Sequence, residues 1–282
     1  MVYLKMIDND EQPKDMKRIL LPIDFSEQSI NCLEYAESLA NAYNSELLIL
    51  HVYGRPKAPE DMSERLFTES GVIDRLKNFV ETNQTKKSNV NIKYLAQVGF
   101  AAEIILSVSK NEKIDLIVLG THGTSNILNR YFGGVSLSIM NKAQCPILLI
   151  PPSVRFIGWN HLGCTINFVF DDLVALNTVI KWSDKFNADM TCLHVLDDLD
   201  EKEVNRKLNL LQELFSHTRI TFKTKIGSLE ETIELFEVTE ELSVLAMIHR
   251  PKNLIGHLLH SDASEAAAEH LKVPLLIFNV PK

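Results

Sequence analysis

The sequence has few cysteines, no excess of positive charge and no long apolar run, and each shortage excludes a class of protein. Its four cysteines in 282 residues form no C-x-x-C pair, so neither a disulfide framework nor a cysteine-ligated zinc site is predicted. The formal net charge of −8 argues against binding of nucleic acid, whose phosphates would be repelled. No apolar run is long enough to cross a membrane and no signal-peptide core is present, so a cytoplasmic protein is expected.

Motifs for rapid catalysis are missing as well. The chain contains no Walker sequence G-x-x-x-x-G-K-[S/T] and no paired carboxylates, so a fast hydrolase is not indicated. Asp24 is a lone acidic residue after a strand, which we interpret as a hydrogen-bond acceptor for a ligand or a helix cap. His122 has no nucleophile or second catalytic partner nearby and is interpreted as a loop residue. The alternative is a slow ATPase in which Asp24 or His122 positions water or a metal.

Short apolar segments alternate with amphipathic ones along the chain. This alternation predicts an α/β fold, with an open parallel sheet covered by helices on both faces. Strands are expected at 18–23, 46–52, 91–96, 114–119 and 146–150, with helices after Ser26, before Asn83 and over 101–110. Ligands bind such sheets beyond the carboxyl ends of the strands, where Asp24, Val52 and Gly120 are expected to meet.

The pattern occurs twice. Leu50-His51-Val52 recurs as Leu193-His194-Val195 at an offset of 143. Cys145-Pro146-Ile147-Leu148 recurs as Val273-Pro274-Leu275-Leu276 at an offset of 128. The second copy is therefore 15 residues shorter, the difference between the two offsets, and the missing residues fall between its second and third strands.

The repeat predicts the domain organisation. A polar lead-in is expected over residues 1–16, a first domain over 17–152 and a second over 161–282. The second domain is predicted to open with a strand at 164–170, followed by a turn at 171–173. No metal site is predicted, because the histidines near its end have no ordered ligand spacing.

Glycines are concentrated where a buried strand of the first copy meets a helix. The residues of this strand-to-helix junction are Gly120, Gly123, Gly133, Gly134, Val135 and Ser136. Glycine lacks a Cβ, so backbone can approach a ligand closely, and the free N–H groups of a helix's first turn attract phosphate oxygens. Phosphate binding is predicted; the alternative is that the glycines only turn the chain.

The spacing Gly120-x-x-Gly123-x9-Gly133 resembles the nucleotide motif of the universal stress protein family, and Leu21 to Ser29 resembles that family's first strand and aspartate turn. The similarity extends over both copies, as in tandem members. It implies two Rossmann-like domains of the adenine nucleotide alpha-hydrolase type, packed through their last strands as an intrachain pseudodimer. In ATP-binding members the aspartate lies near the adenosine, a valine contacts adenine, and the glycines hold ribose and phosphates.

Carried over residue by residue, the resemblance implies a nucleotide site in the first domain. Its residues are Pro22, Asp24, Val52, Leu119, Gly120, Gly123, Gly133, Gly134, Val135 and Ser136. Gly134 stands where the family usually has serine or threonine, so one hydroxyl contact is lost. The expected cofactor is ATP or another adenine nucleotide, with or without Mg²⁺.

The second copy lacks this motif. At the offset of 128, the four glycines become Ile248, Pro251, Ser261 and Asp262. Proline removes a backbone donor, and Asp262 places a negative charge where phosphate would bind. We therefore expect the second domain to keep the fold without a nucleotide site.

The expected function is that of a non-catalytic regulatory protein of stress response, in which ATP binding changes a surface for an unidentified protein partner. The alternative is a nucleotide-free scaffold, because some family members lack the motif and Gly134 weakens it here. Self-association beyond the pseudodimer is left open.

Overall fold

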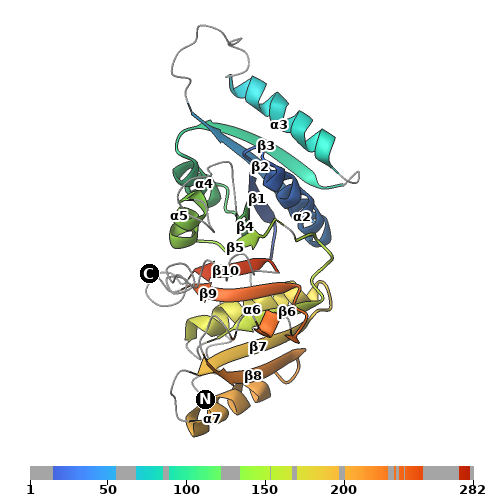
Figure 1. Ribbon diagram of the computed structural model, residues 1–282. Helices are drawn as coiled ribbons and strands as arrows, with labels where there is room; N and C mark the ends of the chain where they lie inside the picture. Colours follow the sequence, from blue (N-terminus) through green and yellow to red (C-terminus); the bar gives the residue numbers. More distant parts are fainter. Residues whose placement is uncertain are drawn as a thin grey trace.

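The computed structural model describes residues 15–54, 68–84, 89–121, 134–152, 154–166, 170–196, 201–227, 232, 235–237, 239–249 and 273–279. These residues form one ten-stranded sheet with the strand order β3-β2-β1-β4-β5-β10-β9-β6-β7-β8. Figure 1 shows two α/β halves that meet at β5 and β10, in the middle of this sheet. The predicted α/β class is confirmed.

The first half contains β1 (Arg18–Pro22), α2 (Glu27–Tyr43), β2 (Glu46–Tyr53), α3 (Glu69–Asn83), β3 (Asn91–Val98), α4 (Ala101–Asn111), β4 (Leu116–Gly120), α5 (Gly134–Lys142) and β5 (Ile147–Ile150). The second half contains β6 (His161–Thr165), α6 (Phe170–Asp184), β7 (Asp189–Leu196), α7 (Glu201–Leu214), β8 (Ile220–Ile226), β9 (Val244–His249) and β10 (Leu275–Asn279). Paired strands within each half run parallel. The five predicted strands of the first half are confirmed to within two residues at either end.

Local signals place the ends of α2. Ser26 lies in an extended conformation before the helix, and its hydroxyl accepts a hydrogen bond from the Ser29 N–H at 3.3 Å. The helix stops at Asn44, whose φ of 55° is left-handed, a conformation that asparagine adopts more readily than most residues. Asn187, at the offset of 143, has a φ of 52° after α6. The two halves thus end this helix in the same way.

Backbone landmarks after the third strand repeat at the other offset. Gly99 and Gly227 are separated by 128 residues and have φ values of 155° and 151°. Lys113 and Glu241, also separated by 128, have φ values of 51° and 50°. The repeat read from the sequence therefore extends to individual turns.

The predicted opening of the second half is wrong. The expected strand at 164–170 is displaced, because β6 ends at Thr165 and Phe170 already belongs to α6. The pairs between β6 and β7 are those between β1 and β2 shifted by 143 residues. Asp24 therefore corresponds to Asn167, which lies outside the described residues. It does not correspond to a residue of the turn at 171–173. Periodicity misled here, because a short apolar run is compatible with both a strand and the start of a buried helix.

The halves are joined by the antiparallel pairing of β5 and β10. Leu148 pairs with Leu276, its own equivalent at the offset of 128, so a local twofold axis passes through this pair. The predicted union through the two last strands is thereby confirmed within one chain. It also covers two apolar strand edges that would otherwise be open to aggregation.

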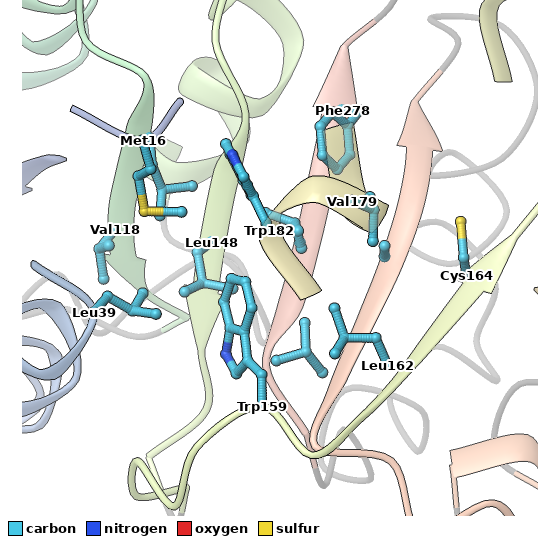
Figure 2. Close-up of a cluster of buried hydrophobic side chains, with 14 of the residues drawn as sticks. Met16, Leu39, Val118, Leu148, Trp159, Leu162, Cys164, Val179, Trp182 and Phe278 are labelled. Atoms are coloured by element: carbon cyan, nitrogen blue, oxygen red, sulfur yellow. The ribbon is translucent and has the colours of Figure 1, made fainter. Parts of the chain in front are cut away.

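Two hydrophobic layers cover the sheet. The layer of α4 and α5 contains Ile105, Leu119 and Ile139. The other layer lies under α2, α3, α6 and α7, and both layers contain residues of both halves. Figure 2 shows part of the layer under α2, α3, α6 and α7, with Met16, Leu39, Val118 and Leu148 near Trp159, Leu162, Val179, Trp182 and Phe278. The halves therefore share a core as well as a sheet.

Buried hydrogen bonds reinforce this junction. Trp159, in the connector between the halves, is fully buried and donates from Nε1 to the Tyr35 hydroxyl at 2.9 Å. The Tyr43 hydroxyl, at the end of α2, donates to the carbonyl of Trp182 in α6. Met16, which the sequence assigned to a polar lead-in, is 2% exposed and belongs to the core.

Candidate functional site

The carboxyl ends of β1, β2, β4 and β5 lie at one edge of the sheet, because these strands are parallel neighbours. Pro22 pairs with Leu50, and Gly120 pairs with Ile150. This register brings the turn after β1, the end of β2 and the end of β4 together, as expected for Asp24, Val52 and Gly120. Gly123, Gly133 and His122 lie outside the described residues.

A hydrogen-bonded turn holds Asp24 between β1 and α2. Its Oδ1 accepts from the Ser26 N–H at 3.0 Å and from the Ser29 hydroxyl at 2.7 Å. The Ser29 hydroxyl also accepts from the Asp24 N–H at 3.1 Å. Asp24 is exposed, so it can take part in the helix start and still face a ligand.

Phe25, the next residue, has a φ of 64°. A left-handed backbone in a bulky non-glycine residue is uncommon and costs about 1–3 kcal/mol, so the surrounding structure must hold it. The ring packs against His51 at 4.6 Å and against Phe79 at 5.4 Å between centroids. The Arg75 guanidinium lies over the ring, with Cζ 4.1 Å from its centroid.

His51 fixes the same turn from β2. Its Nδ1 lies 2.7 Å from the Ile23 carbonyl oxygen, and since a carbonyl only accepts, Nδ1 carries the proton. Burial lowers the pKa of His51 below its ordinary value. The second half repeats the contact, with His194 Nδ1 2.7 Å from the Ile166 carbonyl oxygen. This repetition assigns the two histidines to the fold.

Gly120 is required by packing within the chain. A Cβ at this position would lie 2.3 Å from Cγ of Gln28, whose side chain comes from the first turn of α2. The Gln28 amide donates to the Ile150 carbonyl at 2.8 Å, which ties α2 to the end of β5. Packing against Gln28 therefore explains the glycine at position 120 as well as the expected close approach of a ligand to the backbone does.

The start of α5 is held next to the end of β4. The Ser136 hydroxyl donates to the Gly120 carbonyl at 3.3 Å, and Ser136 is 8% exposed. Gly134, by contrast, faces open space, with no atom within 4 Å of a Cβ built there. Val135 is 37% exposed. The first turn of α5 is therefore accessible, while the Ser136 hydroxyl is engaged with backbone.

The remaining predicted residues lie beneath this edge. Leu119 is 6% exposed and belongs to the core under α4 and α5, and Val52 packs against the same core. Pro22 is partly buried at the end of β1. They form apolar support, with only part of their surface available to a ligand.

Three residues that shape the site were not predicted. Phe25 and Gln28 lie within the motif read from the sequence, but neither had a signal beyond its place next to Asp24 and Ser26. Arg75 comes from α3 and approaches only through the tertiary fold. Among the described residues, no three His, Cys, Asp or Glu side chains group as metal ligands do, and no described helix is long and apolar enough to span a membrane.

Comparisons with known proteins agree with this fold. The sequence model of the Universal stress protein family matches residues 16–151. The Universal stress protein in the QAH/OAS sulfhydrylase 3′ region of Thermus aquaticus is 31% identical over 137 residues, covering 48% of this chain and 98% of that protein. Universal stress protein MJ0577 of Methanocaldococcus jannaschii is 25% identical over 154 residues, covering 48% of this chain and 94% of that protein.

A match over both halves comes from structure. The crystal structure of a universal stress protein from Archaeoglobus fulgidus covers 94% of this chain and 97% of that one, with a TM-score of 0.71 and 16% sequence identity. At this identity the likeness concerns the fold. The match of the family's sequence model and the 31% identical relative, covered over 98% of its length, show that the chain belongs to the universal stress protein family.

Proposed function

We propose that the first half binds one adenine nucleotide, with ATP as the expected ligand, and that binding serves as a non-catalytic regulatory switch in stress response. The supporting observation is the arrangement at the carboxyl edge of the sheet. There, exposed Asp24 and the accessible first turn of α5 flank the end of β4. A carboxylate suits ribose hydroxyls, and a helix start suits phosphates.

The chemistry at this edge supports binding more than turnover. Asp24 Oδ1 accepts two hydrogen bonds that organise the start of α2, which is a structural use of the carboxylate. The Ile23 carbonyl holds His51 on the side of the sheet that α2 and α3 cover. Val52, the next residue on β2, faces the opposite side, toward α4 and α5. We therefore assign Asp24 and Val52 to holding a ligand, leave His51 to the fold, and assign no residue to catalysis.

One observation favours the nucleotide-free scaffold as a second candidate. Gly134 has no side chain, and the Ser136 hydroxyl donates to the Gly120 carbonyl, so neither position offers a hydroxyl to a phosphate. Phosphate binding would then rest on backbone N–H groups alone. If the protein is a nucleotide-free scaffold, the residues at the carboxyl edge stabilise the fold and a protein partner binds at another surface.

The first test is chemical. Freshly purified protein is denatured, released small molecules are identified by mass spectrometry, and the stripped chain is titrated with ATP by calorimetry. We expect one adenine nucleotide per chain. Two per chain would contradict the degenerate second half, and neither released nucleotide nor binding heat at several temperatures would favour the scaffold.

A matched pair of variants locates the site. Gly134→Asp introduces the residue that the second half has at this position, and the open space there allows the side chain. Repulsion between its carboxylate and the phosphates should weaken ATP binding about tenfold or more. Gly134→Asn, of equal size and neutral, should stay within about threefold of wild type. Equal affinities for the two variants would place the phosphates away from α5.

A further inference from the structure

Phe25 differs from every other described non-glycine residue that has a positive φ. The others are Asn44, Asn187, Lys113 and Glu241, each of which follows a helical segment. Phe25 instead precedes a helix and separates Asp24 from the N-cap Ser26. A strained backbone next to the candidate ligand acceptor suggests a functional reason for the strain.

The contacts that hold Phe25 come largely from α3. Arg75 and Phe79 are four residues apart on this helix and therefore lie on one face of it. Arg75 covers the face of the Phe25 ring, with Cζ 4.1 Å from the centroid, and Phe79 meets the ring edge-on at 5.4 Å. His51 of β2 also contacts the ring, with 4.6 Å between centroids.

The turn at Phe25 helps to set the direction of the Asp24 carboxylate, whose Oδ1 also accepts from the Ser29 hydroxyl at 2.7 Å. Asp24 precedes Phe25 directly, and its Oδ1 reaches across Phe25 to the Ser26 N–H at 3.0 Å. If Phe25 relaxed to the usual negative φ, the backbone on either side would turn and this hydrogen bond would be lost. The direction of the Asp24 carboxylate therefore depends on the left-handed conformation of Phe25.

We propose that α3 controls the nucleotide site through the contact of Arg75 with Phe25, so that both are positioning residues for Asp24. This inference rests on the proposed function for its ligand, and on the geometry of the turn for everything else. With Arg75 over the ring, the turn is held and Asp24 is aimed at the ligand. When α3 or Arg75 moves away, the turn relaxes and affinity falls.

Arg75 is exposed and positively charged, so it could also attract an anionic nucleotide without touching Phe25. Lys77, two residues further along α3 and also exposed, provides the control for charge. Arg75→Lys is the conservative variant, because an ammonium keeps the charge and a cation–π contact. Phe25→Leu keeps apolar bulk and removes the ring.

The experiment measures two quantities in full-length wild type, Arg75→Ala, Arg75→Lys, Phe25→Leu and Lys77→Ala. ATP affinity is measured by calorimetry, and amide hydrogen exchange of Ser26 and Ser29 is measured by NMR without nucleotide. Arg75→Ala and Phe25→Leu should weaken ATP binding about threefold to tenfold and speed exchange at both amides by several fold. Arg75→Lys and Lys77→Ala should each stay within about twofold of wild type.

Each failure has a distinct meaning. If Arg75→Ala changes neither affinity nor exchange, the control by α3 is wrong while the nucleotide site stands. If Arg75→Ala and Lys77→Ala weaken binding equally with unchanged exchange, Arg75 acts by charge alone and the proposal is again overturned. If wild type binds no ATP, the proposed function fails, but hydrogen exchange still tests the contact of Arg75 with Phe25. Faster exchange in Arg75→Ala would support the role of Arg75 in holding the turn, and unchanged exchange would overturn it.

Discussion

The two halves share their framework and differ at the carboxyl edge of the sheet. His51 and His194 hold equivalent carbonyls at the same distance of 2.7 Å, one in each half. Gln28 packs over Gly120 in the first half, whereas the second half has Ile248 in place of that glycine. A feature that occurs in both halves is thereby assigned to the fold, and a feature found in one half becomes a candidate for function.

The comparison also separates glycines that the fold requires from one that it does not require. Gly99 and Gly227 have the same positive φ and are needed by the turn after the third strand in both halves. Gly120 is needed to make room for Gln28, and Gly134 has no steric requirement in the first half. Of these four, Gly134 is the one whose replacement tests ligand binding with the least disturbance of the fold.

The largest effect is expected from a charge at the local twofold axis. Leu148 is fully buried and pairs with Leu276, so Leu148→Lys should lower the free energy of unfolding by about 3–5 kcal/mol, the usual result of an unpaired buried charge. Denaturant unfolding followed by far-UV circular dichroism and tryptophan fluorescence measures this. Both tryptophans lie at the junction, so fluorescence reports the contact between halves.

Two further variants sharpen this test of symmetry. Leu276→Lys should destabilise as strongly as Leu148→Lys, because the two residues occupy equivalent places on either side of the axis. Leu148→Met conserves volume and should cost less than about 1.5 kcal/mol. An unchanged transition in Leu148→Lys would show that the halves are joined by other contacts.

A smaller effect is expected at the hydrogen bond between Tyr35 and Trp159. Tyr35→Phe leaves the buried Trp159 Nε1 without its acceptor and should cost about 1–3 kcal/mol. Tyr43→Phe, which removes a donor from the Trp182 carbonyl, should cost about 0.5–1.5 kcal/mol. Urea unfolding of both variants gives the comparison. If Tyr43→Phe were the more damaging change, the Tyr43 contact with α6 would be the main polar link between the halves.

The smallest effect is a pH dependence from His51. Its pKa is lowered by burial, so near and below the ordinary value of about 6.5 the unfolded chain binds more protons than the folded one. Stability from this group is therefore full above that pH and is lost as the pH falls. His51→Asn keeps a donor near the Ile23 carbonyl and should reduce the drop in Tm between pH 7.5 and 5.5 by about 1–2 °C, since His51 is only partly buried. An equal drop in both proteins would assign the pH dependence to other groups.

Periodicity predicted the strands of the first half, because each is a compact apolar run between clear turn signals. It failed at the second half, where β6 reads His-Leu-Gly-Cys-Thr and the more apolar run that follows Cys164 leads into a helix. Within the site, the strand ends were predictable from parallel topology. The cover of Phe25 by Arg75 was not, because no local pattern connects residues 50 positions apart. Nor was the use of the Ser136 hydroxyl, which depends on the distance to a carbonyl on another element.

The pairing of β5 with β10 within one chain has a consequence for how the molecule can change. In an assembly of two identical subunits, each substitution appears twice, and the subunits dissociate when the protein concentration is low. Here the covalent connector keeps the local concentration of each half near the other high, so their association does not depend on how much protein the cell makes. Each half can therefore acquire its own substitutions, and a change suited to one side need not be tolerated on the other.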